Sequence, residues 1–314
     1  MTKTDIVILA AGKGTRMQSA LPKVLHKLAG KPLLGHVLDA AAALGDCHNI
    51  VVTGHGGDAV RALYASTNVT LVEQTQQLGT GHAVLTALPH LREGASVVIL
   101  YGDVPLITTA TLTKMLSAVS SNSLGLLTVT LGNPHGYGRI VRAADGQIES
   151  IVEQKDASPE QQKLCEVNTG VMALTTEQLA RWLPMIGNSN AQGEYYLTDI
   201  VALARRDGCR VTSVQPSSAS EVEGVNNRQQ LAALERAYQR QLAEQLMASG
   251  TTLADPARFD QRGTLSAGTD NFIDVNCVFE GDVTIGSGVT VGPNCLIINS
   301  TLGDNVTVNA NTVI

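Results

Sequence analysis

Short apolar runs alternate with helix-like patterns through the first hundred residues of the chain. The apolar runs cover residues 6–9, 50–52, 69–72 and 97–101, and apolar residues recur at helical spacing in segments 24–44, 59–64 and 82–91. This alternation predicts βαβ units and a mostly parallel sheet. Ligands bind beyond the carboxyl ends of the strands in such sheets. The candidate binding segments are therefore 10–16, 53–57, 73–81 and 102–105.

The pattern becomes mixed between residues 124 and 226, where we expect an insertion or cap that completes a pocket. Strand-like runs occur at 125–130, 138–141, 148–153 and 167–174, with a helical pattern at 198–206. Residues 227–249 then predict one long helix, because apolar residues recur every three or four positions and Gly250 follows as a stop. We expect this helix to connect two domains.

A six-residue repeat occupies the last part of the chain. Its apolar positions are Ile273, Phe279, Ile285, Val291, Ile297, then Leu302 after one step of five, Val308 and Ile314. A strand of an antiparallel sheet has a period of two, so this phase predicts a hexapeptide β-helix rather than a β-sandwich. Stacked repeats normally end in an atypical capping unit, whereas Ile314 begins a new hexapeptide. We therefore expect the repeat to be truncated.

Composition and charge exclude several classes of partner. The 22 Lys+Arg and 28 Asp+Glu give a net charge of −6 without a basic run, and aromatic residues make up only 3% of the chain. Nucleic acid is therefore excluded as a partner. No apolar stretch reaches the roughly 20 residues that span a bilayer. Because the N-terminus carries no cleavage signal either, we expect a cytoplasmic protein without a membrane partner. The five cysteines are far apart, and we expect small buried side chains rather than disulfides or a zinc site.

A glycine loop follows the first strand, at residues 9–17. Gly12 and Gly14 let backbone N–H groups approach a phosphate closely, and nearby cations can neutralise a triphosphate. These cations are Lys13, Arg16 and Lys23. The loop is not a dinucleotide fingerprint, whose third glycine is here Met17, nor a Walker A loop, which requires Gly-Lys-Ser/Thr. It predicts binding of a nucleoside triphosphate rather than an ordinary tight turn.

A single carboxylate, Asp103, follows the strand at 97–101. Mg²⁺ uses one or two protein oxygens and keeps waters and substrate phosphates for its other positions, so Asp103 can hold such an ion against a phosphate. An aspartate that caps a helix is the alternative. The position opposite the glycine loop favours the metal.

Further motifs appear in order along the chain. They are 77–82 (QLGTGH), 101–103 (YGD), 136–139 (GYGR), 153–155 (EQK), 168–170 (NTG), 192–199 (QGEYYLTD) and 223–228 (EGVNNR). Together with the glycine loop, they resemble the bifunctional bacterial UDP-N-acetylglucosamine pyrophosphorylase and glucosamine-1-phosphate N-acetyltransferase family over essentially the whole chain. The resemblance implies a Rossmann-like α/β nucleotidyltransferase domain at 1–228, a linker helix at 229–249 and the start of a left-handed parallel β-helix at 250–314.

The resemblance also implies transfer of the uridylyl group of UTP to N-acetylglucosamine-1-phosphate, with Arg16 and Lys23 as catalytic cations. The substrate-binding residues that it implies are Leu9, Ala10, Ala11, Gly12, Lys23, Gln74, Gly79, Thr80, Tyr101, Gly102, Asp103, Gly138, Glu153, Asn168, Thr169 and Asn226. Among these, Gln74, Gly79 and Thr80 would close over the base. Glu153 and Asn168 would bind the sugar.

Asp103 and Asn226 are the Mg²⁺ ligands that the resemblance implies, with the neighbouring Asn227 as a rival of Asn226. The attacking phosphate needs no general base, because a phosphomonoester has its second pKa at about 6. Catalysis then consists of positioning and neutralisation of charge. We accordingly expect His82 to be a structural residue at a helix start rather than a base.

The second activity of the family, acetyl transfer from acetyl-coenzyme A, uses later coils of the β-helix and a homotrimer. We expect this chain to lack that activity, and its trimerisation is left open. Two alternatives remain: another sugar-phosphate nucleotidyltransferase, such as one that makes ADP-glucose, and a non-catalytic nucleotide-sensing subunit. Competition between UTP and ATP tests the first, and replacement of Asp103 by alanine tests the second.

Overall fold

The computed structural model describes residues 3–54 and 56–314. Internal contacts divide the chain into two compact units. Unit 1 comprises Met1–Leu25 and Leu34–Gly224, and unit 2 comprises His26–Leu33 and Val225–Ile314. The chain therefore passes between the units three times, because a short N-terminal segment belongs with the C-terminal part. The three-part division at residues 228 and 249 stays a proposal.

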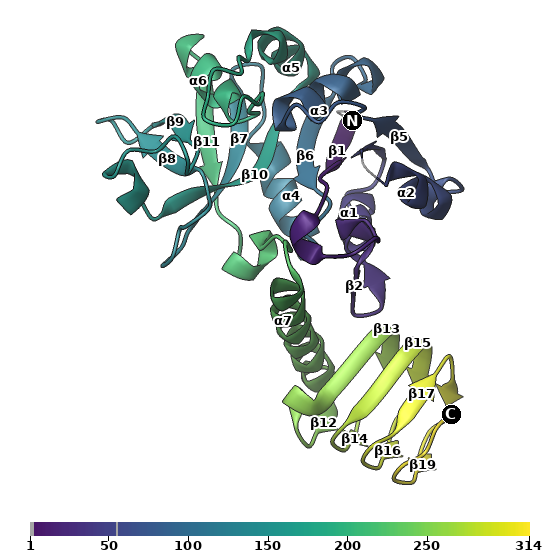
Figure 1. Ribbon diagram of the computed structural model, residues 1–314. Helices are drawn as coiled ribbons and strands as arrows, with labels where there is room; N and C mark the ends of the chain where they lie inside the picture. Colours follow the sequence, from purple (N-terminus) through teal and green to yellow (C-terminus); the bar gives the residue numbers. More distant parts are fainter. Residues whose placement is uncertain (1–2, 55) are drawn as a thin grey trace. The chain divides into compact units, whose positions relative to one another are not determined.

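Unit 1 is built on a sheet whose main path runs β11-β7-β10-β6-β1-β4-β5 (Figure 1). These strands are β1 (Thr4–Ala10), β4 (Cys47–Thr53), β5 (Val69–Glu73), β6 (Ser96–Tyr101), β7 (Ser123–Thr130), β10 (Glu166–Thr175) and β11 (Arg210–Val214). All pairs along this path are parallel except those of β10, which is antiparallel to β6 and β7. The predicted α/β fold with a mostly parallel sheet is confirmed.

Helices pack on both faces of this sheet. They are α1 (Leu33–Ala42), α2 (Gly57–Tyr64), α3 (Thr80–Ala87), α4 (Thr109–Ser117), α5 (Thr176–Trp182) and α6 (Asp199–Arg206). On β1, Val7 and Leu9 cluster with residues of α3, α5 and α6, whereas Ile6 and Ile8 cluster with residues of α1, α2 and α4. Burial on both faces explains why β1 is a continuous apolar run instead of an alternating one.

The segment 24–44 is helical only in its second half, so the prediction of one helical pattern there was wrong. Lys23–Leu25 forms a single 3-10 turn. Between this turn and α1, β2 (Lys27–Leu28) and β3 (Lys31–Pro32) form a hairpin. Its two turn residues have φ angles of 48° and 82°. Two consecutive positive φ angles are typical of a type I′ turn, which a helical spacing of apolar residues does not reveal.

The segment 124–226 is mainly a continuation of the sheet, which corrects the prediction of an insertion or cap. β7, β10 and β11 extend the main path, and only β8 (Arg139–Arg142) and β9 (Ile148–Val152) lie off it as an antiparallel hairpin. The helices α4 and α5 and the strand β11 were not predicted from the sequence. Further 3-10 turns lie at Thr15–Met17, Leu88–His90, Gln161–Lys163, Leu183–Met185, Ala219–Val222 and Pro256–Arg258.

Unit 2 contains the long helix α7 (Arg228–Ala248), which confirms the helix predicted at 227–249. The Asn227 side chain caps its start by accepting the Gln230 N–H at 2.8 Å. Gly250, with φ of 103°, follows its end. A side-chain acceptor at the start and a glycine after the end are ordinary helix boundaries.

Short strands follow α7 and stack in parallel (Figure 1). One sheet contains β12 (Thr251–Leu253), β14 (Asn271–Ile273), β16 (Thr290–Val291) and β19 (Thr307–Val308), and the other contains β13 (Phe259–Ala267), β15 (Cys277–Ile285), β17 (Leu296–Ile298) and β18 (Thr301–Leu302). Phe259 pairs with Cys277, eighteen residues later, which corresponds to three hexapeptides per turn. Thr284 pairs with Thr301, only seventeen residues later, because the single five-residue step of the repeat falls there.

The predicted repeat positions form the core of this β-helix. Ile273, Phe279, Ile285, Val291 and Ile297 are each at most 2% exposed. Leu302 and Val308 are also buried, and Ile314 is exposed. Parallel stacking and this core confirm the hexapeptide β-helix, while its left-handedness stays a prediction.

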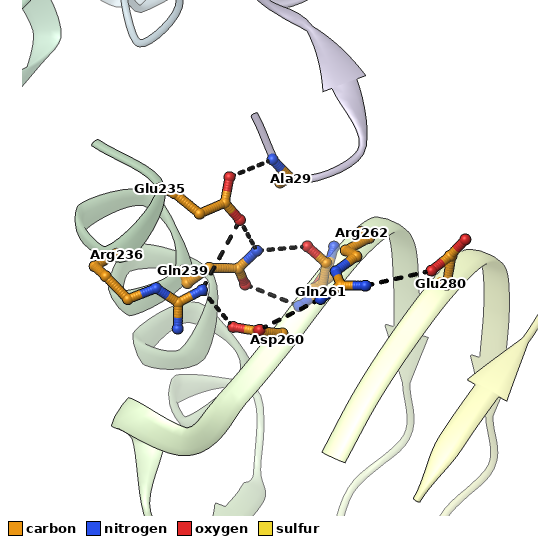
Figure 2. A network of polar contacts seen from close by, with 8 residues as sticks. All are labelled: Ala29, Glu235, Arg236, Gln239, Asp260, Gln261, Arg262 and Glu280. Atoms are coloured by element: carbon orange, nitrogen blue, oxygen red, sulfur yellow. Dashed lines mark hydrogen bonds and ion pairs between the residues drawn. The ribbon is translucent and has the colours of Figure 1, made fainter. Parts of the chain in front are cut away.

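A polar network in unit 2 joins the hairpin turn to α7 and β13 (Figure 2). Glu235 accepts the Ala29 N–H at 2.7 Å and an N–H of the Gln239 amide at 2.9 Å. Gln239 is buried, donates to the Gln261 carbonyl at 2.7 Å and accepts the Gln261 N–H at 2.8 Å. Gln239 thus pairs with the backbone of β13 much as a neighbouring strand would, and Glu235 extends this pairing to the hairpin.

The expectation that the cysteines are buried is right for three of them. Cys209, Cys277 and Cys295 are buried, Cys47 is half-buried and Cys165 is exposed. The expectation was therefore wrong for Cys165, which lies just before β10 and has a free thiol. Within residues 3–54 and 56–314, no helix combines the length and the apolar character needed to cross a membrane.

Candidate active site

The glycine loop and Asp103 lie at the same edge of the unit 1 sheet. β1 and β6 are parallel and adjacent, with Leu9 opposite Tyr101. The Gly102 N–H continues this pairing by donating to the Leu9 carbonyl at 2.9 Å. Ala10 therefore ends β1 and Asp103 follows β6, at the carboxyl ends of neighbouring strands, where ligands bind in this class of fold.

Lys23 forms an ion pair with Asp103, and each side chain is only 15% exposed. The glycine loop packs directly on this lysine, since a Cβ added to Gly14 would lie 2.8 Å from the Lys23 Cβ. Gly14 also has φ of 59°, a conformation that favours glycine. Behind the pair, a Cβ added to Gly102 would lie 3.1 Å from Val24. The structure thus brings the predicted loop, the predicted cation and the predicted carboxylate together.

Arg16 lies in the 3-10 turn Thr15–Met17, immediately after the glycine loop. Its side chain is exposed, whereas the neighbouring Met17 is buried and anchors the turn. Gly12 has open space around its Cα, with no atom within 4 Å of an added Cβ. The backbone of the loop is therefore accessible to a ligand at Gly12, with an arginine four residues further along the chain.

A cavity of about 380 Å³ opens beside the loop and is lined by Lys13, Gly54, Glu73, Gln74, Thr75 and Gln77. Gly54 contacts the glycine loop closely, because an added Cβ would lie 2.7 Å from the Ala11 carbonyl oxygen. The candidate segment 53–57 therefore reaches the site, although His55 lies outside the described residues. The cavity adjoins both the glycine loop and Gln74, as a base pocket requires.

Gln74 is buried, and its side-chain nitrogen lies 3.1 Å from the Gly79 carbonyl and 2.9 Å from the His82 Nδ1. Because the amide donates both of its N–H groups in this arrangement, its carbonyl oxygen is the group that can accept from a ligand. The His82 Nδ1 then acts as an acceptor. This agrees with the structural role expected for His82.

The segment 192–199 is fixed on the turn at the start of α3. The Gly81 N–H donates to the Tyr195 carbonyl at 2.8 Å, and the Leu197 N–H donates to the Thr80 hydroxyl oxygen at 3.1 Å. A Cβ on Gly79 would lie 2.6 Å from the Tyr195 carbonyl oxygen, so only glycine allows this approach. Two motifs that are more than a hundred residues apart in the chain therefore form one wall.

The residues expected to contact the sugar form a second group. A Cβ on Gly138 would lie 3.3 Å from each carboxylate oxygen of Glu153, and the Asn168 N–H donates to the Gly138 carbonyl at 2.8 Å. The Thr169 hydroxyl donates to the Leu127 carbonyl at 2.8 Å. Gly170 packs against Tyr101, because an added Cβ would lie 2.4 Å from its ring. The structure therefore brings these predicted residues together around β10.

Burial shapes the acid–base properties of this group. Burial raises the pKa of Glu153, and a hydrogen bond from the Thr198 hydroxyl at 3.2 Å opposes the shift. The pKa of Tyr101 is also raised, mainly by burial and then by the charges of Glu153 and Asp103. Tyr101 packs against Gly170 and lies two residues before Asp103, so it connects the predicted sugar-contacting group with the Lys23–Asp103 pair.

A second cavity, of about 300 Å³, adjoins Glu153 and includes Tyr196 and Asp199 in its lining. Roles for Thr198, Tyr196 and Arg139 were not predicted, although each residue lies inside one of the sequence motifs. Arg139 is 2% exposed and makes hydrogen bonds to Tyr137 before β8 and to Gln154 after β9. Their position inside the motifs was the only available signal.

The residues around Asp103 suit a cation that is bound partly by protein oxygens and partly by phosphate oxygens of the substrate. Among the described residues, no group of three or more His, Cys, Asp or Glu side chains lies close enough together to hold a metal ion. One partly exposed carboxylate with a glycine beside it, Gly224, leaves room for phosphate and water oxygens. The side-chain oxygen of Asn227 caps α7, which favours Asn226 over Asn227 as a second ligand. Asn226 belongs to unit 2, so its pairing with Asp103 stays a prediction.

A glycine loop at the end of β1, backed by an ion-paired lysine and aspartate, defines the class of nucleoside triphosphate transferases. Residues 6–183 match the family model of the MobA-like NTP transferase domain. A structure of UDP-glucose pyrophosphorylase complexed with UDP-glucose is similar, with a TM-score of 0.59 at 19% identity over 77% of this chain and 100% of that one. At this identity the likeness shows the fold alone.

Two curated relatives are much more similar in sequence. The bifunctional protein GlmU of Marinobacter nauticus is 55% identical over 314 residues, which are 100% of this chain and 69% of the relative. The bifunctional protein GlmU of Cellvibrio japonicus is 57% identical over 306 residues, 98% of this chain and 68% of the relative. The chain belongs to the family of the bifunctional protein GlmU, which confirms the resemblance seen in the sequence. It is a nucleotidyltransferase, and the alternative of a non-catalytic sensor is not favoured.

Proposed function

We propose that unit 1 transfers the uridylyl group of UTP to N-acetylglucosamine-1-phosphate and releases pyrophosphate. The observation that carries this proposal is the Lys23–Asp103 pair, held against the glycine loop at the carboxyl ends of β1 and β6. A cation and a carboxylate at this point suit a triphosphate and its counter-ion. The family membership supports the nucleotidyl transfer.

Gln74 and the glycine loop would bind the nucleotide. The carbonyl oxygen of Gln74 can accept the N3–H of uracil, because the Gln74 amide nitrogen donates to Gly79 and His82. Adenine has no such donor on its ring. Backbone groups of Leu9, Ala10, Ala11 and Gly12 would then lie along the ribose and phosphates, with Lys13 lining the same cavity.

Glu153 and Asn168 would bind the sugar, beside Gly138, Thr169 and Tyr101. A carboxylate accepts hydrogen bonds from sugar hydroxyls, and an amide side chain both donates and accepts. The Thr198 hydroxyl donates to Glu153 and keeps one of its oxygens in place. This arrangement leaves the 1-phosphate of the sugar free to approach the α-phosphorus of the nucleotide.

The reaction needs few parts. A phosphate oxygen of the sugar phosphate forms a bond to the α-phosphorus of UTP in line with the bond that breaks, and the leaving group is pyrophosphate. The attacking phosphate is ionised near neutral pH, because its second pKa is about 6, so no protein base takes a proton. Lys23 and Arg16 would neutralise charge that moves toward the leaving pyrophosphate.

Asp103 would hold a divalent cation, proposed to be Mg²⁺, together with Asn226. When bound, such an ion neutralises phosphate charge and fixes the phosphate oxygens in place. Lys23 already pairs with Asp103, and an ammonium group with three N–H donors can contact a carboxylate and a phosphate at the same time.

Release of pyrophosphate from UTP and N-acetylglucosamine-1-phosphate tests this proposal. We expect turnover with UTP and much less with ATP, and loss of turnover in the Asp103→Ala variant while the protein stays folded, as judged by circular dichroism. Asp145→Asn, in the exposed turn between β8 and β9, is the matched control and should keep full activity. Equal turnover with ATP, or full activity of Asp103→Ala, would contradict the proposal.

A further inference from the structure

Arg139 is a buried cation that the proposed reaction does not use. It begins β8 and is 2% exposed. Its guanidinium donates to the Tyr137 carbonyl, to the Gln154 side-chain oxygen at 2.7 Å and to the Gln162 carbonyl at 3.4 Å. Within the part of the chain that the structure describes, all of these acceptors are neutral. Buried arginines usually pair with a carboxylate, so a specific reason for this arrangement is required.

The acceptors of Arg139 come from two loops, one before β8 and one between β9 and β10. Tyr137 lies in the loop before β8, whereas Gln154 and the 3-10 turn that contains Gln162 lie near the start and the end of the β9–β10 loop. The oxygen of Gln154 also accepts the Gly136 N–H at 3.1 Å, which closes the first loop on the second. A guanidinium group is planar and directs its N–H groups at fixed angles, so one side chain can hold the two loops, and both ends of the second loop, in register.

These loops carry the residues that would contact the sugar. Gly138 directly precedes Arg139, and Glu153 directly precedes Gln154. The Cα of Gly138 faces the Glu153 carboxylate, because an added Cβ would lie 3.3 Å from each of its oxygens. Since Arg139 bonds to the neighbour of each residue, the spacing of Gly138 and Glu153 depends on its guanidinium.

We propose that Arg139 is a positioning residue for the sugar 1-phosphate, which holds Gly138 and Glu153 at the spacing that binds the sugar. It acts through these residues and does not touch the substrate. The nucleotide cavity beside Gln74 is lined by other segments, so Arg139 affects one substrate and not the other. This inference rests on the proposed function, because it concerns the second substrate of that reaction.

The test compares KM for the two substrates in Arg139→Met and Arg139→Lys, measured by pyrophosphate release. Displacement of sugar-binding groups should raise KM for N-acetylglucosamine-1-phosphate by about tenfold or more and change KM for UTP by less than about twofold. Lysine keeps the charge but lacks the planar fork, so it should not restore the sugar KM. The control is Arg142→Met on the same strand, because Arg142 pairs with Glu166 at 2.7 Å in a more exposed position.

Parallel changes in both KM values, or a normal sugar KM with lysine, would overturn the inference. If Arg139→Met does not fold, as judged by its melting temperature, Gln154→Ala provides the second variant, since it removes the shared acceptor and keeps the guanidinium. It should raise the sugar KM in the same direction by a smaller factor, and an unchanged sugar KM would overturn the inference. If the unaltered chain releases no pyrophosphate from these substrates, the proposed function fails instead.

Discussion

Replacement of Glu235 by glutamine tests whether the polar network of unit 2 requires a carboxylate at this position (Figure 2). Glu235 accepts one N–H from Ala29 and one from Gln239, on separate oxygens. Glutamine has only one carbonyl oxygen, so its NH₂ group would face one of these donors. Gln239 cannot turn its amide to compensate, because the N–H and carbonyl of Gln261 fix its orientation.

The expected loss of hairpin stability can be estimated from the hydrogen bond to Glu235 and from the backbone conformation of Ala29. A hydrogen bond to a charged group contributes about 1.5–3 kcal/mol, so loss of one such bond should destabilise the closed hairpin by about 2 kcal/mol. Ala29 also has φ of 48°, a conformation that costs a non-glycine residue about 1 kcal/mol. The turn therefore depends on its tertiary contacts. A change of about 2 kcal/mol corresponds to about thirtyfold in the opening equilibrium.

Amide hydrogen exchange of residues 26–33, followed by mass spectrometry, measures this opening directly. Glu235→Gln should exchange about thirtyfold faster in this segment. Addition of Ala29→Gly should recover part of the protection, because glycine adopts the positive φ without strain. Arg240→Gln is the control: Arg240 lies on the same helix, is exposed and pairs with Glu244 on the surface, which contributes little. Unchanged exchange in Glu235→Gln, or equal acceleration in the control, would refute the reasoning.

Three further predictions concern single side chains. Gly170→Ala should raise KM for the sugar phosphate by about tenfold or more, because the new Cβ would meet the Tyr101 ring; steady-state kinetics that match the unaltered chain would exclude this clash. Glu153→Gln should raise the melting temperature at about pH 7 while it weakens sugar binding, because burial raises the pKa of Glu153 and so penalises its charged form in the folded state. This gain in stability should shrink as the pH falls through the raised pKa, where the folded protein already holds the proton, and a gain that grows toward low pH would contradict the sign. Cys165 should react with a thiol reagent in the native protein, whereas Cys277, whose pKa is raised by burial, should react only after unfolding. Equal native labelling of the two thiols, seen by mass spectrometry, would show that the β-helix core opens.

The β-helix was the part of the fold most open to prediction from sequence. Each repeat position has the same environment as the equivalent position in the neighbouring turn, so a six-residue sequence pattern is enough to predict the architecture. The hairpin at 27–32 is the opposite case. Its turn is held by Glu235, which lies 206 residues away in the chain, so no local pattern could reveal it.

The residues of the candidate site also fall into those with a local sequence signal and those whose role depends on distant partners. Gly14 follows β1, Asp103 follows β6 and Lys23 comes nine residues after Gly14, so their chemistry could be predicted from their own motifs. The roles of Thr198 and Arg139 depend on partners from other loops, namely Glu153 and Gln162. Such roles appear only when the fold brings the loops together.

The hairpin that belongs to unit 2 has a consequence for dividing the protein. A cut after Gly224 leaves His26–Leu33 attached to unit 1, although its partners Glu235 and Arg262 are removed. β2, which contains the completely buried Leu28, would then lose its contacts with α7, and the Ala29 N–H would lose its acceptor. Unit 1 therefore cannot be separated from unit 2 by one cut in the chain, because residues 26–33 also belong to unit 2. A chimera that places it on another β-helix must also supply a carboxylate at the position of Glu235, or replace the hairpin.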